Sequence, residues 1–271
     1  MARGKGILTN FRFAPITGQM SASFEKNFYR FLKHWFSNSF EVIIQPLLFF
    51  LCFGFGLQKW IGEVSGLDYP LFLFYGILCA TAMSTSLNES ALGLFDKYIS
   101  NRQYLILATC PTSNSDLLVG EFLWSVFKSM LAVSILLLIG TSMELVPVTE
   151  FLQILMCCLW ISIFFSSLGL LIGMLIDSRR KLNQLVNLIS IPLFLFSGVF
   201  FPVERLPELL QTLVYLFPIT SAIDWLRDNR FQFGTDIIAR VTLFLLLSFI
   251  FLNFSYTKFR YKMHRLLERG H

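Results

Sequence analysis

The sequence predicts an all-α membrane protein with six transmembrane helices, an N-terminal interfacial amphipathic helix and short external re-entrant helices between spans five and six. Hydrophobic residues make up 55% of the 271 residues and charged residues only 14%, whereas a soluble domain of this length needs more charge to cover its surface. Apolar stretches of about 20 residues, the length that crosses a hydrocarbon core of roughly 30 Å, also recur along the chain.

The predicted spans follow one another with short polar gaps. In chain order they cover about 40–57, 71–95, 122–139, 151–176, 182–201 and 237–256. Pro46 and Pro192 lie inside spans one and five, where a proline kinks a helix or frees a carbonyl for a neighbouring group. The chain is therefore expected to divide into a leader with its amphipathic helix, a six-span domain and a basic cytoplasmic tail, at 1–38, 39–256 and 257–271.

The positions of the basic residues predict the orientation. Lys and Arg gather before span one, in the gaps after spans two and four, and in the C-terminal tail. Cytoplasmic loops carry this excess of positive charge, so both termini are expected in the cytoplasm and the number of spans is expected to be even. The net charge of +5 is explained by topology and by contact with anionic lipid, and nucleic acid is not a predicted partner.

Aromatic residues before span one recur at helical spacing, while Lys26, Arg30 and Lys33 fall on other faces. The apolar positions are Phe24, Phe28, Phe31, Leu32, Trp35 and Phe36. A helix of this kind lies along the membrane surface. The alternative is a soluble helix packed on a partner.

The segment 202–236 between spans five and six is too apolar for an ordinary external loop. Pro207 and Glu208 open a helical pattern that closes before Pro218, and a second short helix is expected near 222–227. Ten residues cannot cross a bilayer, so the segment is interpreted as external re-entrant or interfacial helices.

Ionisable residues inside a bilayer are costly, and each one raises a functional question. Glu89 lies near the cytoplasmic end of span two, and Lys128 lies about two turns into span three from the same side. We expect these two residues to form an ion pair. The alternative is that each reaches the interface separately, Lys128 by snorkelling.

Polar residues also open span five. Asn183 and Asn187 share one helix face, with Gln184 beside them. These amides either bond across helices at a subunit interface or face a water-filled substrate path.

No catalytic or metal-ligating constellation is predicted. The three histidines lie far apart in sequence, the five cysteines lack the spacing of a metal site, and the G-x-x-x-x-G-K-[ST] phosphate loop does not occur. The chain is expected to hold no cofactor, so ATP would have to be bound by a separate chain. A membrane-embedded enzyme acting on lipid-linked sugars would need a cluster of reactive groups, and the acidic residues near one membrane face lack a nucleophile; they are Glu204, Glu208, Asp224, Asp228 and Asp236.

An ion-coupled secondary transporter is a third class. It would use unpaired intramembrane carboxylates or an internal inverted repeat, and the sequence shows no convincing repeat.

The gap 96–120 is long and polar, and its end can cap the helix that leads into span three. It includes the run Asn101, Arg102, Gln103 and Tyr104. The segment either docks on a partner or forms a surface hairpin.

Several motifs resemble the permease subunits of ABC type 2 exporters. The most specific covers Pro192–Pro207, PLFLFSGVFFPVERLP, and continues through Leu216–Thr220 to Asp224. Further runs agree with it: Gln45–Leu48 with Phe53–Leu57, then Phe74–Leu78, Asn88–Ser90 and Gly93–Phe95, and then Leu107–Thr109 through Val119–Trp124 with Lys128. The resemblance extends from about residue 20 to the end, and it is closest to the branch of nodulation lipo-oligosaccharide, polysaccharide and drug exporter permeases.

The resemblance implies a bacterial inner-membrane exporter in which two permease subunits, this chain and a second copy, work with two ABC ATPase subunits that bind ATP and Mg. An amphipathic substrate, a glycolipid or lipid-linked oligosaccharide in preference to a drug, would cross outward by alternating access. Asn101, Arg102, Gln103 and Tyr104 would contact the ATPase. One departure lies at Cys110 and Pro111, because family members usually place the proline directly after the threonine.

Overall fold

A computed structural model describes residues 24, 27–29, 31–33, 40–97, 114–228 and 235–269. The elements in chain order are η1 (Phe40–Ile44), α3 (Gln45–Phe49), η2 (Phe50–Phe55), α4 (Gly56–Ile61), β1 (Glu63–Val64), β2 (Leu67–Asp68), α5 (Tyr69–Asn88), η3 (Glu89–Gly93), α7 (Asn114–Ser142), η5 (Val148–Glu150), α8 (Phe151–Leu175), α9 (Arg179–Phe196), η6 (Val203–Arg205), α10 (Glu208–Val214), α11 (Pro218–Arg227) and α12 (Thr235–Arg269). Apart from a two-strand hairpin, these elements are helical, which confirms the all-α class.

Within the described residues, five helices are long and apolar enough to cross a membrane. They run over Val42–Ile61, Tyr69–Gly93, Ser115–Ser142, Val148–Leu175 and Ile237–Lys262. The first combines η1, α3, η2 and α4, so π-helical turns lie on both sides of the α3 turn that contains Pro46. A proline has no N–H to donate, which accounts for an irregular ladder at this point.

The predicted fifth span differs from the structure. It corresponds to α9, whose 18 residues begin with three basic residues and end at Phe196 rather than at 201. The chain turns away at Gly198, which adopts a positive φ of 92° that favours glycine. Because the apolar part of α9 is short, this helix is not one of the five, and a count of six is reached only if the bent pair α10 and α11 forms one broken span.

Two other predicted span boundaries differ from the helix ends in the structure. The predicted third span began at 122, but α7 begins at Asn114, so 114–120 of the polar gap already belongs to the helix. The predicted sixth span ended at 256, whereas α12 continues to Arg269. Both helices continue from the apolar stretch into polar residues, so apolarity alone does not mark their ends.

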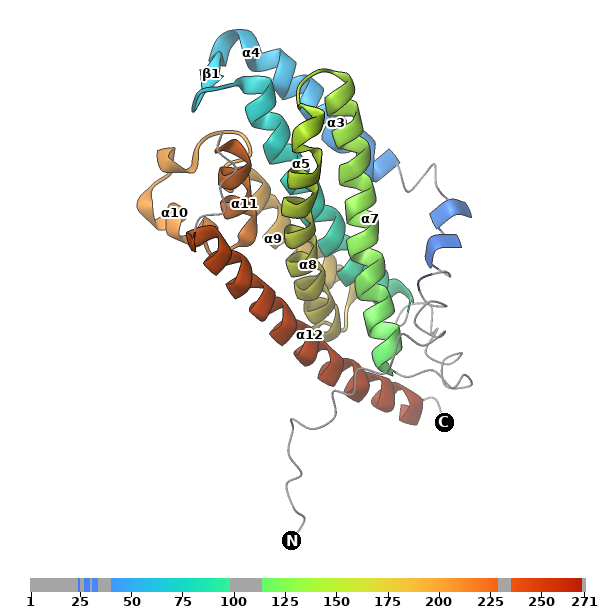
Figure 1. Cartoon of the computed structure of the whole chain (residues 1–271). Coiled ribbons are helices and arrows are strands. Elements are labelled where there is room, and N and C mark those ends of the chain that lie inside the picture. Colours follow the sequence, from blue (N-terminus) through green and yellow to red (C-terminus); the bar gives the residue numbers. More distant parts are fainter. Residues whose placement is uncertain are drawn as a thin grey trace.

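The predicted helix opened by Glu208 is present as α10, and the second short helix, α11, begins at Pro218 rather than near 222. The two meet at an angle of 97°. Figure 1 shows α10 and α11 beside the half of α5 that is nearer to β1, while the start of α7 lies at the opposite end of the bundle.

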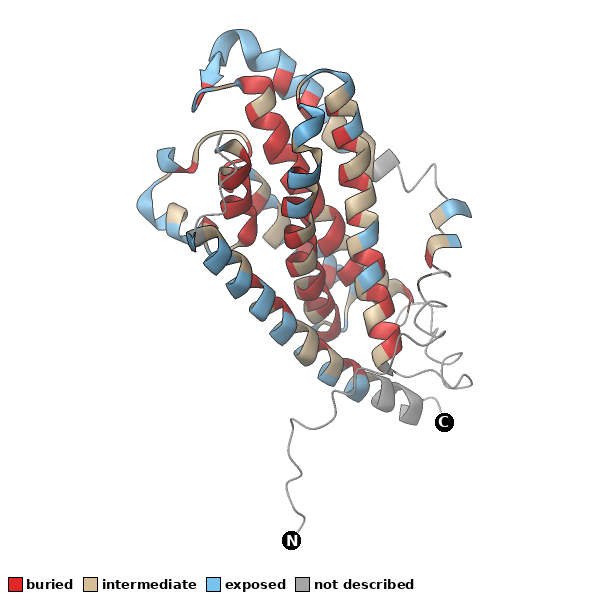
Figure 2. Ribbon diagram, viewed as in Figure 1, coloured by how far each residue is buried: buried red, intermediate tan, exposed pale blue. Residues whose placement is uncertain are grey.

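The helices α5 and α8 form the buried centre of the bundle, whereas α10 and α12 expose much of their surface (Figure 2). Small residues let α8 approach the end of span two closely. A Cβ on Gly169 would lie 2.0 Å from Ser90 Oγ, and one on Gly173 would lie 3.0 Å from the Ala91 carbonyl oxygen. Such small-xxx-small spacing is typical of packed membrane helices.

Candidate functional site

Four charged side chains meet where span two ends and α7 begins, and we call Glu89, Lys97, Glu121 and Lys128 the charge cluster. Glu89 lies at the start of η3. Lys128 Nζ lies 2.7 Å from Glu89 Oε2, and Lys97 Nζ lies 3.5 Å from Glu89 Oε1. The structure thus places the two residues that the sequence paired in direct contact, and it adds a second lysine.

The other half of the cluster joins α7 to the helical residues 24, 27–29 and 31–33, which we call the N-terminal helix. Lys97 Nζ lies 2.6 Å from Glu121 Oε2, and Asn27 Nδ2 donates to Glu121 Oε1 at 3.0 Å. The Trp124 indole donates to Glu89 Oε1 at 2.9 Å. The two carboxylates are therefore held by donors from span two, α7 and the N-terminal helix.

The charge cluster is balanced in charge and largely buried. The side chains of Lys97 and Glu121 are 9% and 4% exposed, and those of Glu89 and Lys128 are each 16% exposed. At such low exposure the charges cannot rely on water, and removing one partner leaves an uncompensated charge that destabilises strongly. The cluster therefore favours one arrangement of these three segments.

Aromatic side chains enclose one side of the cluster. Phe24 and Phe31 make edge contacts with Trp124, and Phe24 and Phe28 make edge contacts with Phe127. The aromatic face predicted for the N-terminal helix thus packs on α7 at these positions. The predicted residues Trp35 and Phe36 lie outside the described part of the chain.

Two further ion pairs lie around the cluster. Arg179, the first residue of α9, binds Asp96 with both ends of its guanidinium, through Nε at 2.5 Å and Nη2 at 2.9 Å. Lys262 of α12 contacts Asp177 Oδ1 at 2.8 Å and donates to the Ile176 carbonyl at 3.2 Å. A cation beside the last carbonyls of a helix is stabilising, so Lys262 joins α12 to the end of α8.

The remaining predicted site residues divide into two groups. Asn183, Gln184 and Asn187 lie on α9 with exposed side chains. Asn101, Arg102, Gln103 and Tyr104 lie outside the described residues, as does 98–113 as a whole. Their roles remain predictions. The structure does show that the residues just before this segment, Asp96 and Lys97, are tied to α9 and α7.

Sequence reasoning found Glu89 and Lys128 but missed Lys97 and Glu121. It assigned Lys97 only to topology, although a signal was present. Glu89 and Lys97 are eight residues apart, and Glu121 and Lys128 are seven apart, so each pair shares one helix face. An acidic and a basic residue about two helical turns apart, repeated on the next helix of the chain, predict a cluster of four charges.

Two of the acidic residues considered for an enzyme, Glu204 and Asp224, interact electrostatically in the described part of the chain. Asp224 Oδ2 accepts from the Tyr215 hydroxyl at 2.9 Å, while Glu204, Glu208 and Asp228 are exposed. Arg240 donates to Ser221 Oγ at 2.9 Å and lies over the Tyr215 ring. These contacts join α10, α11 and α12, which is a structural role.

Comparison with known proteins identifies relatives of this chain and its family. The chain is 26% identical over 215 residues to Nodulation protein J of Rhizobium leguminosarum bv. viciae, covering 77% of this chain and 80% of that one. It is 25% identical over 185 residues to Nodulation protein J of Neorhizobium galegae, covering 68% and 71%. It is 28% identical over 189 residues to the putative transport permease ycf38 of Cyanophora paradoxa, covering 68% and 65%. The pattern of the ABC-2 type transporters matches residues 18–231, and the chain therefore belongs to this family.

Proposed function

We propose that the chain is the permease subunit of an ABC exporter that moves an amphipathic substrate outward, and that two copies of it work with two copies of a separate ATPase subunit. Membership of the ABC-2 type transporter family and the five apolar helices support a multi-pass transport subunit. In this proposal the permease provides the path across the membrane, and ATP hydrolysis takes place on the partner.

The observation that carries the proposal is the position of the charge cluster. The segment 98–113 follows directly after Lys97 and directly precedes α7, which carries Glu121 and Lys128. Any displacement of this segment acts on Asp96 and Lys97, and through their ion pairs on α9 and α7. The ion pairs therefore offer a physical route from a cytoplasmic partner to α7 and α9.

The proposed mechanism is alternating access. Closure of the ATPase dimer would push on Asn101–Tyr104, and the charge cluster would make span two, α7 and the N-terminal helix move together. A ligand shifts such an equilibrium only by binding one state better than the other. Here the ATP-bound partner would be the ligand that favours the outward-open state.

The proposed substrate is a glycolipid or a lipid-linked oligosaccharide. Support comes from the relatives named for nodulation and from the exposed face of α9. That face runs from Arg180 and Lys181 through Gln184 and Asn187 to Leu188, Ile191 and Leu195. Basic, amide and apolar groups in this order match a polar head followed by a lipid tail. Export of a drug is the alternative within the same family.

Substitutions in the coupling segment test the assignment. We expect Arg102→Ala and Tyr104→Ala to leave the permease folded and associated with the ATPase but to uncouple ATP hydrolysis from transport, because the contact that carries the movement is weakened. Arg260→Ala is the matched control, since this exposed arginine lies on α12. If transport and ATP hydrolysis of the complex stay unchanged in both coupling variants, the segment does not carry the movement.

A further inference from the structure

Arg227, the last residue of α11, connects three separate parts of the chain. Its Nη1 donates to the Gly198 carbonyl at 2.6 Å, and its Nη2 donates to the carbonyls of Phe72 at 2.8 Å and Val199 at 3.1 Å. The guanidinium carbon also lies 3.3 Å from the centre of the Phe72 ring. This single side chain therefore holds the turn after α9 and the end of α11 against the first turns of α5.

The turn after α9 touches α5 at a glycine. A Cβ on Gly76 would lie 2.8 Å from Val199 Cα and 2.9 Å from its carbonyl oxygen. Both are backbone atoms, so a larger residue at 76 would push the turn away. Arg227 and Gly76 thus support the same contact by independent means, one through hydrogen bonds and one through close approach.

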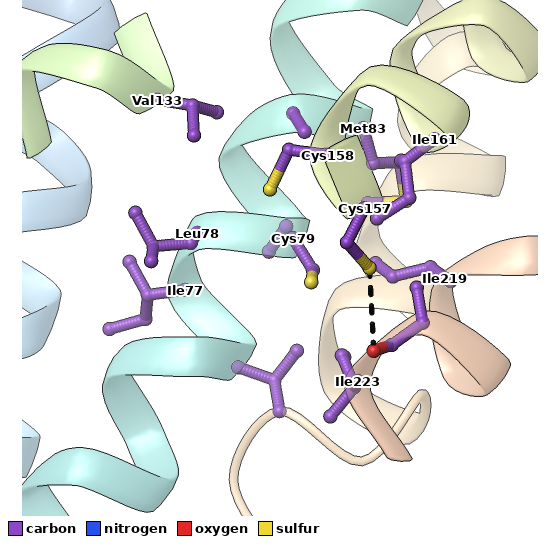
Figure 3. Packing of buried hydrophobic residues seen from close by; sticks show 14 of the residues in the cluster. Ile77, Leu78, Cys79, Met83, Val133, Cys157, Cys158, Ile161, Ile219 and Ile223 are labelled. Carbon is purple, nitrogen blue, oxygen red and sulfur yellow. Dashed lines mark hydrogen bonds between the residues drawn. The ribbon is translucent and has the colours of Figure 1, made fainter. Parts of the chain in front are cut away.

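Beneath this contact lies a group of buried cysteines. Phe72, Gly76 and Cys79 follow one another along one face of α5, at spacings of four and three residues. Cys79, Cys157 and Cys158 are 0%, 3% and 0% exposed, and Cys157 Sγ donates to the Ala222 carbonyl of α11 at 3.6 Å. Figure 3 shows these cysteines between α5, α8 and the α11 residues Ile219 and Ile223.

We infer that Arg227 is the latch that closes the end of the bundle opposite the charge cluster. In this state the latch keeps α11 and 197–201 against α5, and its release lets both move away and exposes the buried Cys79. A planar guanidinium can serve several carbonyls in fixed directions, whereas a lysine ammonium cannot reproduce this fork. The inference rests on the proposed function for its role in transport, but the latch itself is a property of the folded chain.

The native cysteines can report on the latch. With Cys52→Ser and Cys110→Ser in the background, the remaining cysteines are the three in the buried group. We expect a membrane-impermeant thiol reagent, added to the full permease in lipid nanodiscs, to label this group slowly. Arg227→Ala should raise the labelling rate by about tenfold or more, because hydrogen bonds from a charged donor are lost and the local opening is favoured.

Matched variants separate a latch from general loosening. Gly76→Ala should also speed labelling, and it provides the test if Arg227→Ala does not fold. The labelling rate of Arg227→Lys should fall between those of the wild type and Arg227→Ala. Arg205→Ala removes an exposed arginine of the same external segment, and Gly56→Ala adds a Cβ that meets no atom within 4 Å, so both should label at the wild-type rate. Wild-type labelling rates in both Arg227→Ala and Gly76→Ala, or equally fast labelling in the two controls, would overturn the latch.

Addition of the ATPase separates the latch from the proposed function. ATP with vanadate should raise labelling of the wild-type complex toward the Arg227→Ala rate and leave Arg227→Ala itself unchanged, an effect that a purely structural role would not produce. If Arg227→Ala labels fast but ATP has no effect on the wild type, the latch stands and the ATP-driven function fails. If ATP speeds labelling equally in both, Arg227 is not the latch.

Discussion

At the level of single residues, the charge cluster determines which substitutions the protein tolerates. Glu89 accepts hydrogen bonds or ion-pair contacts from Lys97, Lys128 and Trp124. Neutralising this carboxylate therefore weakens three contacts at once. Lys97 keeps Glu121 as a partner when Glu89 is neutralised. Lys128 is more sensitive, since Glu89 is the acid with which the described structure pairs it.

Neutralising Glu89 should therefore lower the stability of the permease. We expect Glu89→Gln to destabilise the purified permease by about 3 to 5 kcal/mol, because it leaves the buried Lys128 charge without its acid. The double variant Glu89→Gln with Lys128→Gln should recover part of that loss. Thermal unfolding in detergent measures both, with Glu63→Gln, at an exposed strand position, as a control within about 0.5 kcal/mol of wild type. A double variant no more stable than Glu89→Gln alone would show that the pair is not coupled.

Exchanging the two charges gives a second test at this scale. Glu89→Lys with Lys128→Glu should rescue stability only in part, because the new lysine at 89 would lie beside Lys97, whose Nζ is 3.5 Å from the present carboxylate. Adding Lys97→Met together with Glu121→Gln to the exchange should improve the rescue, because the like-charge contact is removed and no buried carboxylate is left without its lysine. Complete rescue by the simple exchange would contradict the place of Lys97 in the cluster.

At the level of the helices, close packing between α8 and the end of span two depends on glycine. Hydroxyl groups also join α7 to its neighbours. Ser129 Oγ of α7 lies 2.8 Å from Ser162 Oγ of α8 and donates to the Ala82 carbonyl of α5 at 3.0 Å. These contacts bring α5, α7 and α8 together near the charge cluster. They hold the helices in fixed register, which the proposed route through the ion pairs requires.

Gly169→Ala tests this packing. The added Cβ would lie 2.0 Å from Ser90 Oγ and 2.8 Å from the Leu87 carbonyl oxygen, so the helices must separate. We expect a loss of about 1 to 3 kcal/mol or more in thermal unfolding, the usual range for overpacking. Pairing this change with Ser90→Gly should restore part of the stability by removing the hydroxyl. An unchanged unfolding temperature for Gly169→Ala alone would show that the two helices do not pack this closely.

Element boundaries show how far the sequence could predict the fold. Length and apolarity identified the helices around 71–95, 151–176 and 237–256, because a bilayer imposes one length on every span. The fifth span was wrong in its extent: 197–201 is as apolar as the helix before it, and only the turn at Gly198 distinguishes the two. The partners of Arg227 are carbonyl oxygens, which carry no residue-type signal, so that contact required the folded chain.

For the whole molecule, the proposal requires both termini on the same side of the membrane. Cysteines introduced near residue 2 and near residue 270, in a background without native cysteines, should both be protected from an impermeant reagent in intact cells and react after lysis. This outcome follows from the distribution of basic residues. Labelling of one terminus alone in intact cells would exclude the orientation and would place the charge cluster and the predicted coupling segment on the wrong side.

The same topology separates the two functional ends. The charge cluster lies where α7 begins and the Arg227 latch lies beside the opposite half of α5, so α5 together with η3 connects them. We expect movements at the two ends to be coupled through this buried helix, with the ATPase acting on one end and the substrate leaving at the other.

ATP-dependent transport in a defined system tests the central claim most directly. The permease and its ATPase subunit, reconstituted together in liposomes, should move a fluorescent lipid-linked oligosaccharide across the bilayer when ATP is supplied on the ATPase side, and vanadate or a hydrolysis-deficient ATPase should abolish the movement. Transport by the permease alone at the same rate, or chemical conversion of the oligosaccharide without the ATPase, would contradict the claim that this chain is an ATP-driven permease.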